Sequence, residues 1–502
     1  MSPPPATAGR REWIGLAVIA LPCLLYSMDL TVLNLAVPSL SADLKPSSTQ
    51  LLWIIDIYGF LVAGSLITMG TLGDRIGRRR LLLIGAAAFG VASTLAAFSR
   101  SAGMLIATRA MLGLAGATLA PSTLSLIRNM FYDPRQRGVA VGVWIASYSV
   151  GAVIGPPLGG FLLEHFWWGS VFLVSVPMMV LLLVLGPMLL PEFRDPGAGR
   201  PDVLSALLSV AAVLGVIYGL KQIAANGVGW LPALSIGAGL ALGATFLRRQ
   251  QKLTDPLIDL RLFRAPAFSA SIVTYMFATF AVFGPYVFIA QYLQLVLGLS
   301  PMKAGLWSIP SAVGFVVGSL SSPVIGRRVR PAVMMAAGLV VAAVGFVVLS
   351  RADGIWVVVA SAVLFSLGLS PVFTLANDLI LGTAPPERAG AASAISETCS
   401  ELGGALGIAI LGSIGTAVYR RGMVASVVVD GIPEEAAAAA RDTLGGAVAA
   451  AGQLPGAGAA LLDMARTAFT HGLQAAAIVS ALVVLGVAVL VTVSLRHVRP
   501  AA

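Results

Sequence analysis

Apolar stretches of membrane-spanning length recur almost from end to end of this 502-residue chain. A helix that crosses the hydrocarbon core of a bilayer needs about 20 such residues, and its backbone must satisfy its own hydrogen bonds because lipid offers none. Hydrophobic residues make up 58% of the chain and charged residues only 11%. These features predict an all-α integral membrane protein.

Fourteen stretches fit a transmembrane helix, and their order suggests two six-helix bundles with two additional helices between them. We expect a cytoplasmic lead at 1–12, a first bundle at 13–190, the additional pair with its linkers at 191–266, a second bundle at 267–495 and a tail at 496–502. The second bundle would include an extracellular loop at 419–469 with short surface helices. The predicted spans are 13–37, 50–72, 81–99, 103–127, 138–163, 168–190, 203–224, 229–247, 268–297, 304–325, 332–350, 355–382, 390–418 and 470–495.

The net charge of +10 comes from basic residues placed in alternate connections between these spans. If the N-terminus is cytoplasmic, 22 of the 32 Lys and Arg residues fall on the cytoplasmic side. This asymmetry is typical of an inner or plasma membrane protein and predicts that both termini are cytoplasmic. It argues against a nucleic-acid partner and leaves the lipid bilayer as the expected surroundings of a monomer.

Five carboxylates interrupt the apolar stretches, and Arg109 is the one cation that we assign to the membrane with them. An ionised side chain at the bilayer centre costs at least roughly 2.5–3.5 kcal/mol, so such residues are usually functional. We expect them to carry protons or to bind a cationic substrate. They are Asp29, Asp56, Asp378, Glu397 and Glu401.

Depth along the helices groups three of these charges. Asp29, Asp56 and Arg109 are predicted at comparable depth toward the outer leaflet, where an acid and an arginine can exchange partners upon protonation or substrate binding. The alternative is a static ion pair that only fixes helix packing.

Glu397 and Glu401 are four residues apart and therefore share one face of their helix. Two close acids in a low-dielectric site do not both ionise easily, so one is expected to hold a proton near neutral pH. Alternatively, one of them lines a wet vestibule without coupling. Asp378, beside Asn377, is a weaker candidate that could equally satisfy a helix break.

Several segments resemble motifs of the major facilitator superfamily, and in particular of its fourteen-helix drug:proton antiporters. The loop 70–80, GTLGDRIGRRR, is similar to the superfamily's signature loop, and residues 28–34 in the first span resemble the motif of the fourteen-helix branch. Residues 109–113 and 151–160 match the helix-four arginine motif and the helix-five antiporter motif. The segments 52–58 and 396–403 resemble the quaternary-ammonium (QacA/SmvA-type) multidrug exporters.

The resemblance implies roles for two glycine-rich segments. The signature loop would act as a conformational latch, with Asp74 near a helix N-terminus or an arginine of the opposite bundle; the latch residues are Gly70, Gly73, Asp74, Arg75, Gly77 and Arg78. The antiporter motif would act as a hinge or a seal against leak, although glycines at four-residue spacing also serve plain helix packing. Its residues are Gly151, Gly155, Pro156, Gly159 and Gly160. Where some relatives carry an acid in helix ten, this chain has Phe315.

Aromatic residues in the spans could line a cavity for flat lipophilic cations, although most membrane aromatics serve packing. The candidates are Trp53, Tyr58, Trp144, Tyr148, Tyr286 and Trp307.

These observations predict an exporter that exchanges protons for lipophilic cations such as quaternary ammonium compounds, dyes, antiseptics and antibiotics. Such a protein would use the proton gradient and need no cofactor or metal; none of the four lysines follows glycine as a phosphate-binding loop requires. The alternatives are a secondary transporter of a specific metabolite or self-made antibiotic, and a membrane-bound enzyme. The second is disfavoured because His165, His471 and His497 are scattered and no nucleophile motif is present.

Overall fold

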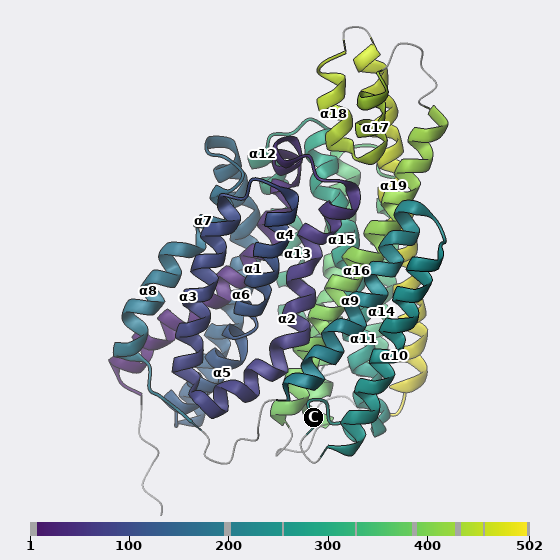
Figure 1. Ribbon diagram of the computed structural model, residues 1–502. Coiled ribbons are helices and arrows are strands. Elements are labelled where there is room, and N and C mark those ends of the chain that lie inside the picture. The colour runs from purple at the N-terminus through teal and green to yellow at the C-terminus, as the bar shows by residue number, and fades with distance from the viewer. Residues whose placement is uncertain are drawn as a thin grey trace, which may run out of the picture.

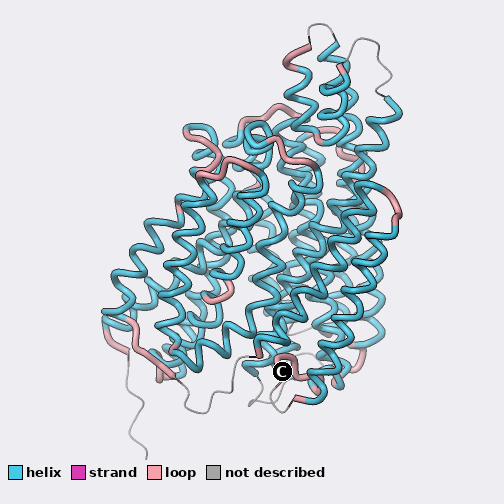
Figure 2. Tube along the Cα trace, viewed as in Figure 1, coloured by secondary structure: helices cyan, strands magenta, loops and turns pink. Residues whose placement is uncertain are grey.

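The computed structural model describes residues 8–194, 202–253, 256–326, 329–383, 389–426, 433–454 and 457–498. Within these residues every regular element is helical, and fourteen helical segments are long and apolar enough to cross a membrane. The helices run side by side, and the loops gather mainly at the two ends of the bundle (Figure 2). The predicted all-α membrane fold is confirmed.

The first half of the chain forms a bundle around its own apolar core. Helix α1 packs against α6, α2 against α4, and α3 against α8 (Figure 1). One predicted span is broken between α4 and α5, and another between α7 and α8. The elements of this half are α1 (Arg10–Leu44), α2 (Ser48–Ile76), α3 (Arg78–Ala97), α4 (Ala102–Gly116), α5 (Leu119–Met130), α6 (Pro134–His165), α7 (Ser170–Leu173) and α8 (Ser175–Leu189).

The second half packs α11 against α16, and α14 against α15 and α19, around a separate core. Its spans are also interrupted: α11 continues into a π-helical turn, and α12 is separated from α13 at Ser308. The elements are η1 (Leu262–Arg264), α11 (Pro266–Gln291), η2 (Tyr292–Val296), α12 (Pro301–Trp307), α13 (Ile309–Gly326), α14 (Pro331–Leu349), α15 (Ile355–Thr383), α16 (Ala389–Ser426), α17 (Glu434–Asp442), α18 (Leu444–Ala451) and α19 (Ala457–Ser494).

The short helices α17 and α18 stand at one end of the bundle, which we call the loop end (Figure 1). They occupy less of the chain than the loop predicted at 419–469, because α16 continues to Ser426 and α19 already begins at Ala457. The side chain of Asp442 binds Arg420 of α16 and accepts a 3.0 Å hydrogen bond from the backbone N–H of Ser48 at the start of α2. The loop is thereby anchored to both halves.

The two additional helices, α9 (Val203–Asn226) and α10 (Trp230–Lys252), pack tightly against each other. Where the two helices meet, Asp202 caps the N-terminus of α9. Its Oδ1 forms an ion pair with Nη2 of Arg249 of α10, 3.1 Å away. Helix α9 also contacts α2 of the first half and α16 of the second. The pair therefore lies along the seam between the halves, rather than being attached to one of them alone.

The antiporter-motif residues place α6 against both α1 and the second half. Gly151, Gly155 and Gly159 lie against Leu24, Met28 and Val32 of α1, and a Cβ atom at any of them would collide with α1. On the second half, a Cβ atom at Gly160 would lie 2.6 Å from the carbonyl oxygen of Pro301. Small residues let helices approach this closely in membranes.

A side chain at Gly160 should disturb this contact between the halves. For the exporter that the sequence predicts, we expect Gly160→Leu to reduce transport of a fluorescent substrate by roughly tenfold or more, because about 1–3 kcal/mol of overpacking would destabilise the state in which the halves touch here. Gly142→Leu is the matched control on the same helix, because nothing lies within 4 Å of a Cβ atom built there. Equal activities of the two variants in everted vesicles would contradict a role of this contact in transport.

Candidate functional site

Asp29 and Arg109 form an ion pair inside the first half. Nη1 of Arg109 lies 2.6 Å from Oδ2 of Asp29, and the arginine side chain is only 1% exposed. Its Nε donates a 3.2 Å hydrogen bond to the carbonyl oxygen of Ile54, and its guanidinium lies 4.7 Å from the centre of the Tyr58 ring. Arg109 thus connects α1 and α2 through α4.

The surroundings of Asp29 belong to the first half alone. A small cavity beside it is lined by Phe89, Phe172 and Ser175, from α3, α7 and α8. Asp29 therefore faces the interior of its own bundle. This position suits a side chain that senses protonation more than one that meets a bulky substrate.

The sequence suggested that Asp56 and Asp29 could exchange Arg109 as a partner. In the structure, Asp56 has a different ion-pair partner. Its partner is Lys221 of α9, whose Nζ lies 2.9 Å from Oδ1 and 2.7 Å from Oδ2. Asp56 is 1% exposed and Lys221 2%. The same ammonium lies 3.7 Å from the centre of the Trp53 ring, within the range of a cation–π interaction.

Lys221 corrects the prediction that Arg109 is the one cation within the membrane. The residue lies inside the span Val203–Ile223. Its position within the predicted stretch 203–224 was the signal that could have identified it, because a lysine buried in lipid needs an acidic partner. The sequence could not show that this partner is Asp56, 165 residues away.

Glu397 and Glu401 lie on α16 where it meets the first half. Glu401 and Asp56 line one small cavity between α2, α11 and α16. Glu401 also lies next to Tyr26 of α1, and Glu397, one turn away, is exposed. Among the described residues, no Lys or Arg forms an ion pair with either glutamate.

The remaining candidate acid stands apart from this group. Asp378 lies on an exposed part of α15, near the end of that helix at Thr383. The structure thus brings Asp56 and Glu401 together at the seam, with Glu397 on the same face of α16.

Several predicted aromatic residues gather around Tyr26, which the sequence analysis did not single out. The Tyr26 ring lies 5.9 Å from that of Tyr58 and 6.0 Å from that of Tyr148. Trp144 packs edge-on against Tyr148 and donates a 3.0 Å hydrogen bond to Thr123. The three-residue spacing of Tyr26 and Asp29 on one helix was the signal for Tyr26.

The other aromatic candidates lie elsewhere. Trp307 packs against the exposed Trp356 with ring centres 5.1 Å apart, and Tyr286 is partly buried on α11. Phe315, at the helix-ten position, packs against Phe373, which in turn contacts Tyr275.

The latch residues form a compact turn within the first half. Asp74 binds Arg78 at 2.6 Å, and Arg78 also donates a 3.3 Å hydrogen bond to the carbonyl of Pro121. Gly77 has φ +113, a conformation that favours glycine, and lets the chain pass directly from α2 to α3. Among the residues that the structure describes, the ion-pair partner of Asp74 is Arg78, at the start of α3 in the same half. Gly70 and Gly73 lie beside Pro121 and Arg78, and Arg75 is exposed.

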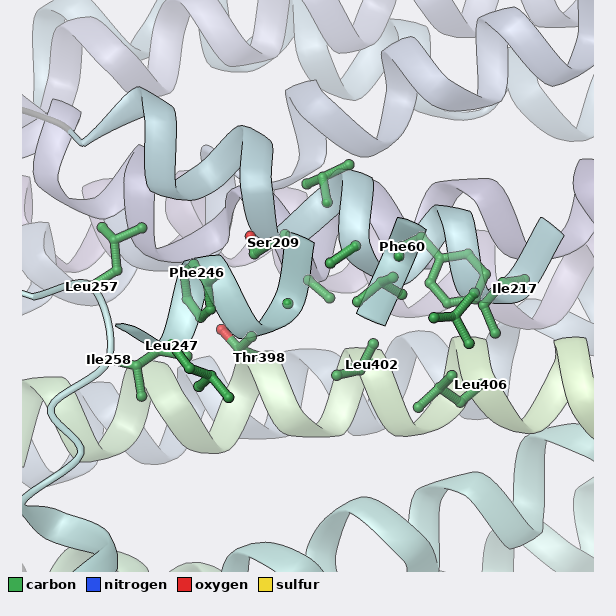
Figure 3. A pocket seen from close by; sticks show the side chains of 18 of the residues that line it. Phe60, Ser209, Ile217, Phe246, Leu247, Leu257, Ile258, Thr398, Leu402 and Leu406 are labelled. Carbon is green, nitrogen blue, oxygen red and sulfur yellow. The ribbon is translucent and has the colours of Figure 1, made fainter. Parts of the chain in front are cut away.

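A larger cavity of about 570 Å³ lies near the Asp56–Lys221 ion pair, between α2, α9, α10 and α16 (Figure 3). Its lining is apolar apart from Ser209 and Thr398. Phe60 and Ile217 close one end of it, one helical turn from Asp56 and Lys221 respectively. Among the described residues, no cluster of His, Cys, Asp and Glu could hold a metal ion.

Fourteen candidate membrane helices form two halves with an additional pair at their seam, and carboxylates lie at and beside this seam. This arrangement is typical of a membrane transporter. The Major Facilitator Superfamily model matches residues 19–408, and the chain belongs to that family.

Three relatives match along nearly their whole length. The chain is 45% identical to the multidrug efflux pump LfrA of Mycolicibacterium smegmatis, with 97% of each protein covered. It is 37% identical to the methyl viologen resistance protein SmvA of Salmonella typhimurium, with 91% of this chain and 93% of the relative covered. Identity to the tetracenomycin C resistance and export protein of Streptomyces glaucescens is 33%, covering 98% and 93%.

The fold is also similar to that of a solved transporter. A bacterial homologue of the human lysosomal transporter Spinster superposes with a TM-score of 0.71 at 17% identity, covering 97% of this chain and 98% of the other. This likeness shows the fold alone.

Breaking the Asp29–Arg109 pair should destabilise the protein more than removing it altogether. Asp29→Asn leaves a buried guanidinium without its carboxylate, which costs about 3–5 kcal/mol in comparable sites. We expect the melting temperature of the purified protein to fall in Asp29→Asn, and to recover in part in Asp29→Asn combined with Arg109→Gln. If the double variant melts at a lower temperature than both Asp29→Asn and Arg109→Gln, the loss of stability does not come from breaking this ion pair.

Proposed function

We propose that the protein is a proton-coupled antiporter that exports lipophilic, mostly cationic compounds across the cell membrane. The observation that carries this proposal is the group formed by Asp56, Glu397 and Glu401 at the seam between the halves. Carboxylates in this position can accept either a proton or an organic cation, and the two compete for the same negative charge. The names of the relatives, which include a multidrug efflux pump and resistance proteins, support export of drugs.

In this proposal the two halves rock about the seam, as transporters built from paired bundles do. The aromatic group around Tyr26 and the apolar side chains at the seam receive the flat, apolar part of the substrate. The carboxylates receive its charge. The chain works as a monomer, with both termini in the cytoplasm and α17 and α18 outside, and needs no cofactor besides the proton gradient.

A chain of contacts links the two charged groups. Arg109, paired with Asp29, lies over Tyr58; Tyr58 packs against Tyr26; and Tyr26 lies next to Glu401. A proton on Asp29 would release the arginine and disturb this packing. Protonation in the first half can therefore alter the surroundings of the substrate carboxylate without direct contact.

The export assay follows from this proposal. Everted vesicles that contain the protein should accumulate ethidium when respiration acidifies their interior, and an uncoupler should abolish the accumulation. The Asp29→Asn variant, compared at an equal amount of folded protein below its melting temperature, should lose most of the gradient-driven uptake. Uptake that persists at full rate after uncoupling would contradict proton coupling.

The two glutamates of α16 should divide the substrate range. One remaining acid suffices for a monocation, but a dication needs two. Glu397→Gln and Glu401→Gln should therefore each keep appreciable ethidium transport. The double variant should lose most of it. Because Phe315 supplies no third acid, we expect even the wild type to handle dications poorly; methyl viologen, named in one relative, is a suitable dication probe. Full ethidium transport by the double variant would show that neither glutamate binds substrate or protons.

A further inference from the structure

We propose that Asp56 and Trp53 form a binding subsite for the cationic group of a substrate, and that Lys221 of the additional helix pair fills this subsite between transport events. The inference deepens the proposed export of organic cations and rests on it. It assigns α9 a direct role in selecting substrates.

The surroundings of the Lys221 ammonium are those that recognise an organic cation. Both carboxylate oxygens of Asp56 lie within 2.9 Å of Nζ, and the Trp53 ring lies 3.7 Å away. A carboxylate combined with an aromatic face attracts ammonium and similar groups through charge and through the ring quadrupole. Lys221 therefore occupies the place that a substrate cation would take.

Apolar contacts also hold α9 in the fold. Ile217 of α9 packs with Phe60 of α2 and with Ala405 and Ala409 of α16 in a fully apolar cluster. The polar pair lies one helical turn away from Phe60 on α2 and from Ile217 on α9. Replacing a buried ion pair by apolar side chains is often neutral or stabilising. A charge retained here points to a role beyond packing.

Asp56 also borders a small cavity at the seam. Beside Glu401 it lines a cavity of about 40 Å³, together with Gly59, Thr279 and Phe283. This space is too small for a drug-sized molecule, since sites of that kind have about 300–1,000 Å³. A substrate that binds Asp56 must therefore displace the ammonium, and lysine suits this exchange because its charge sits on a flexible stem.

The additional helices thus supply a competitor for the site. A monocation that binds more tightly than the tethered ammonium takes Asp56, whereas a neutral molecule gains nothing from displacing it. The apparent affinity for cations is lowered by the fraction of time in which Lys221 fills the subsite.

The test is direct binding to the purified full-length protein, measured by calorimetry with tetraphenylphosphonium as the monocation and triphenylphosphine oxide as the neutral probe. Lys221→Gln should lower the Kd of tetraphenylphosphonium roughly tenfold, the gain expected when a competitor that fills a site about 90% of the time is removed. The Kd of triphenylphosphine oxide should not change. Lys252→Gln, at the exposed end of α10, is the matched control and should behave as the wild type.

Adding Asp56→Asn to Lys221→Gln should return the Kd of tetraphenylphosphonium to the wild-type value or higher, because the carboxylate that binds the cation is then absent. An unchanged Kd in Lys221→Gln, or the same gain in the double variant, overturns the proposal. If Lys221→Gln does not fold, Lys221→Arg keeps the pair and offers both carboxylate oxygens a bidentate partner. It should raise the Kd of tetraphenylphosphonium, and an unchanged or lower Kd overturns the proposal.

These binding outcomes are separate from transport. Failure of gradient-driven ethidium uptake in vesicles contradicts the proposed function even if tetraphenylphosphonium binds as expected. Conversely, normal uptake together with an unchanged Kd in Lys221→Gln contradicts only the subsite.

Discussion

The cost of placing charge in a low-dielectric interior shapes this protein more than any other constraint. An ion that leaves water must gain a partner or a polar cavity, or the fold loses several kcal/mol. Asp29 meets the requirement with Arg109, and Asp56 with Lys221. Glu401 instead lies at the seam beside Asp56. In the proposed mechanism, a proton or a substrate cation neutralises its charge there.

This division gives the two halves different tasks. The first half holds the Asp29–Arg109 pair within its own bundle, connected through Tyr58 and Tyr26 to the seam. The second half contributes the glutamates of α16, and the additional helices contribute Lys221. Glycines of α6 bring the halves into close contact at another point, between Gly160 and Pro301. Asp56, Lys221 and Glu401 thus lie at the seam, about which the halves would rock in the proposed mechanism.

The helical architecture could be predicted because length and hydropathy determine what can cross a bilayer. The interruptions inside spans, as between α4 and α5, could not be, since they depend on packing with neighbouring helices. The shared face of Glu397 and Glu401 followed from helical periodicity alone. By contrast, the pairing of Asp56 with Lys221 joins residues far apart in sequence, and depth along a helix does not say which way a side chain faces. The same limit applies to Asp74, whose partner within the described part of the chain is the neighbouring Arg78.

The central claim is that an organic cation and protons exchange through the carboxylates at the seam, and the most direct measurement is the pH change that accompanies transport. Purified protein in liposomes with an acidic interior should release protons when ethidium is added outside, and the Glu397→Gln/Glu401→Gln variant should release far fewer. Ethidium accumulation by the wild type without any change in internal pH would contradict the account.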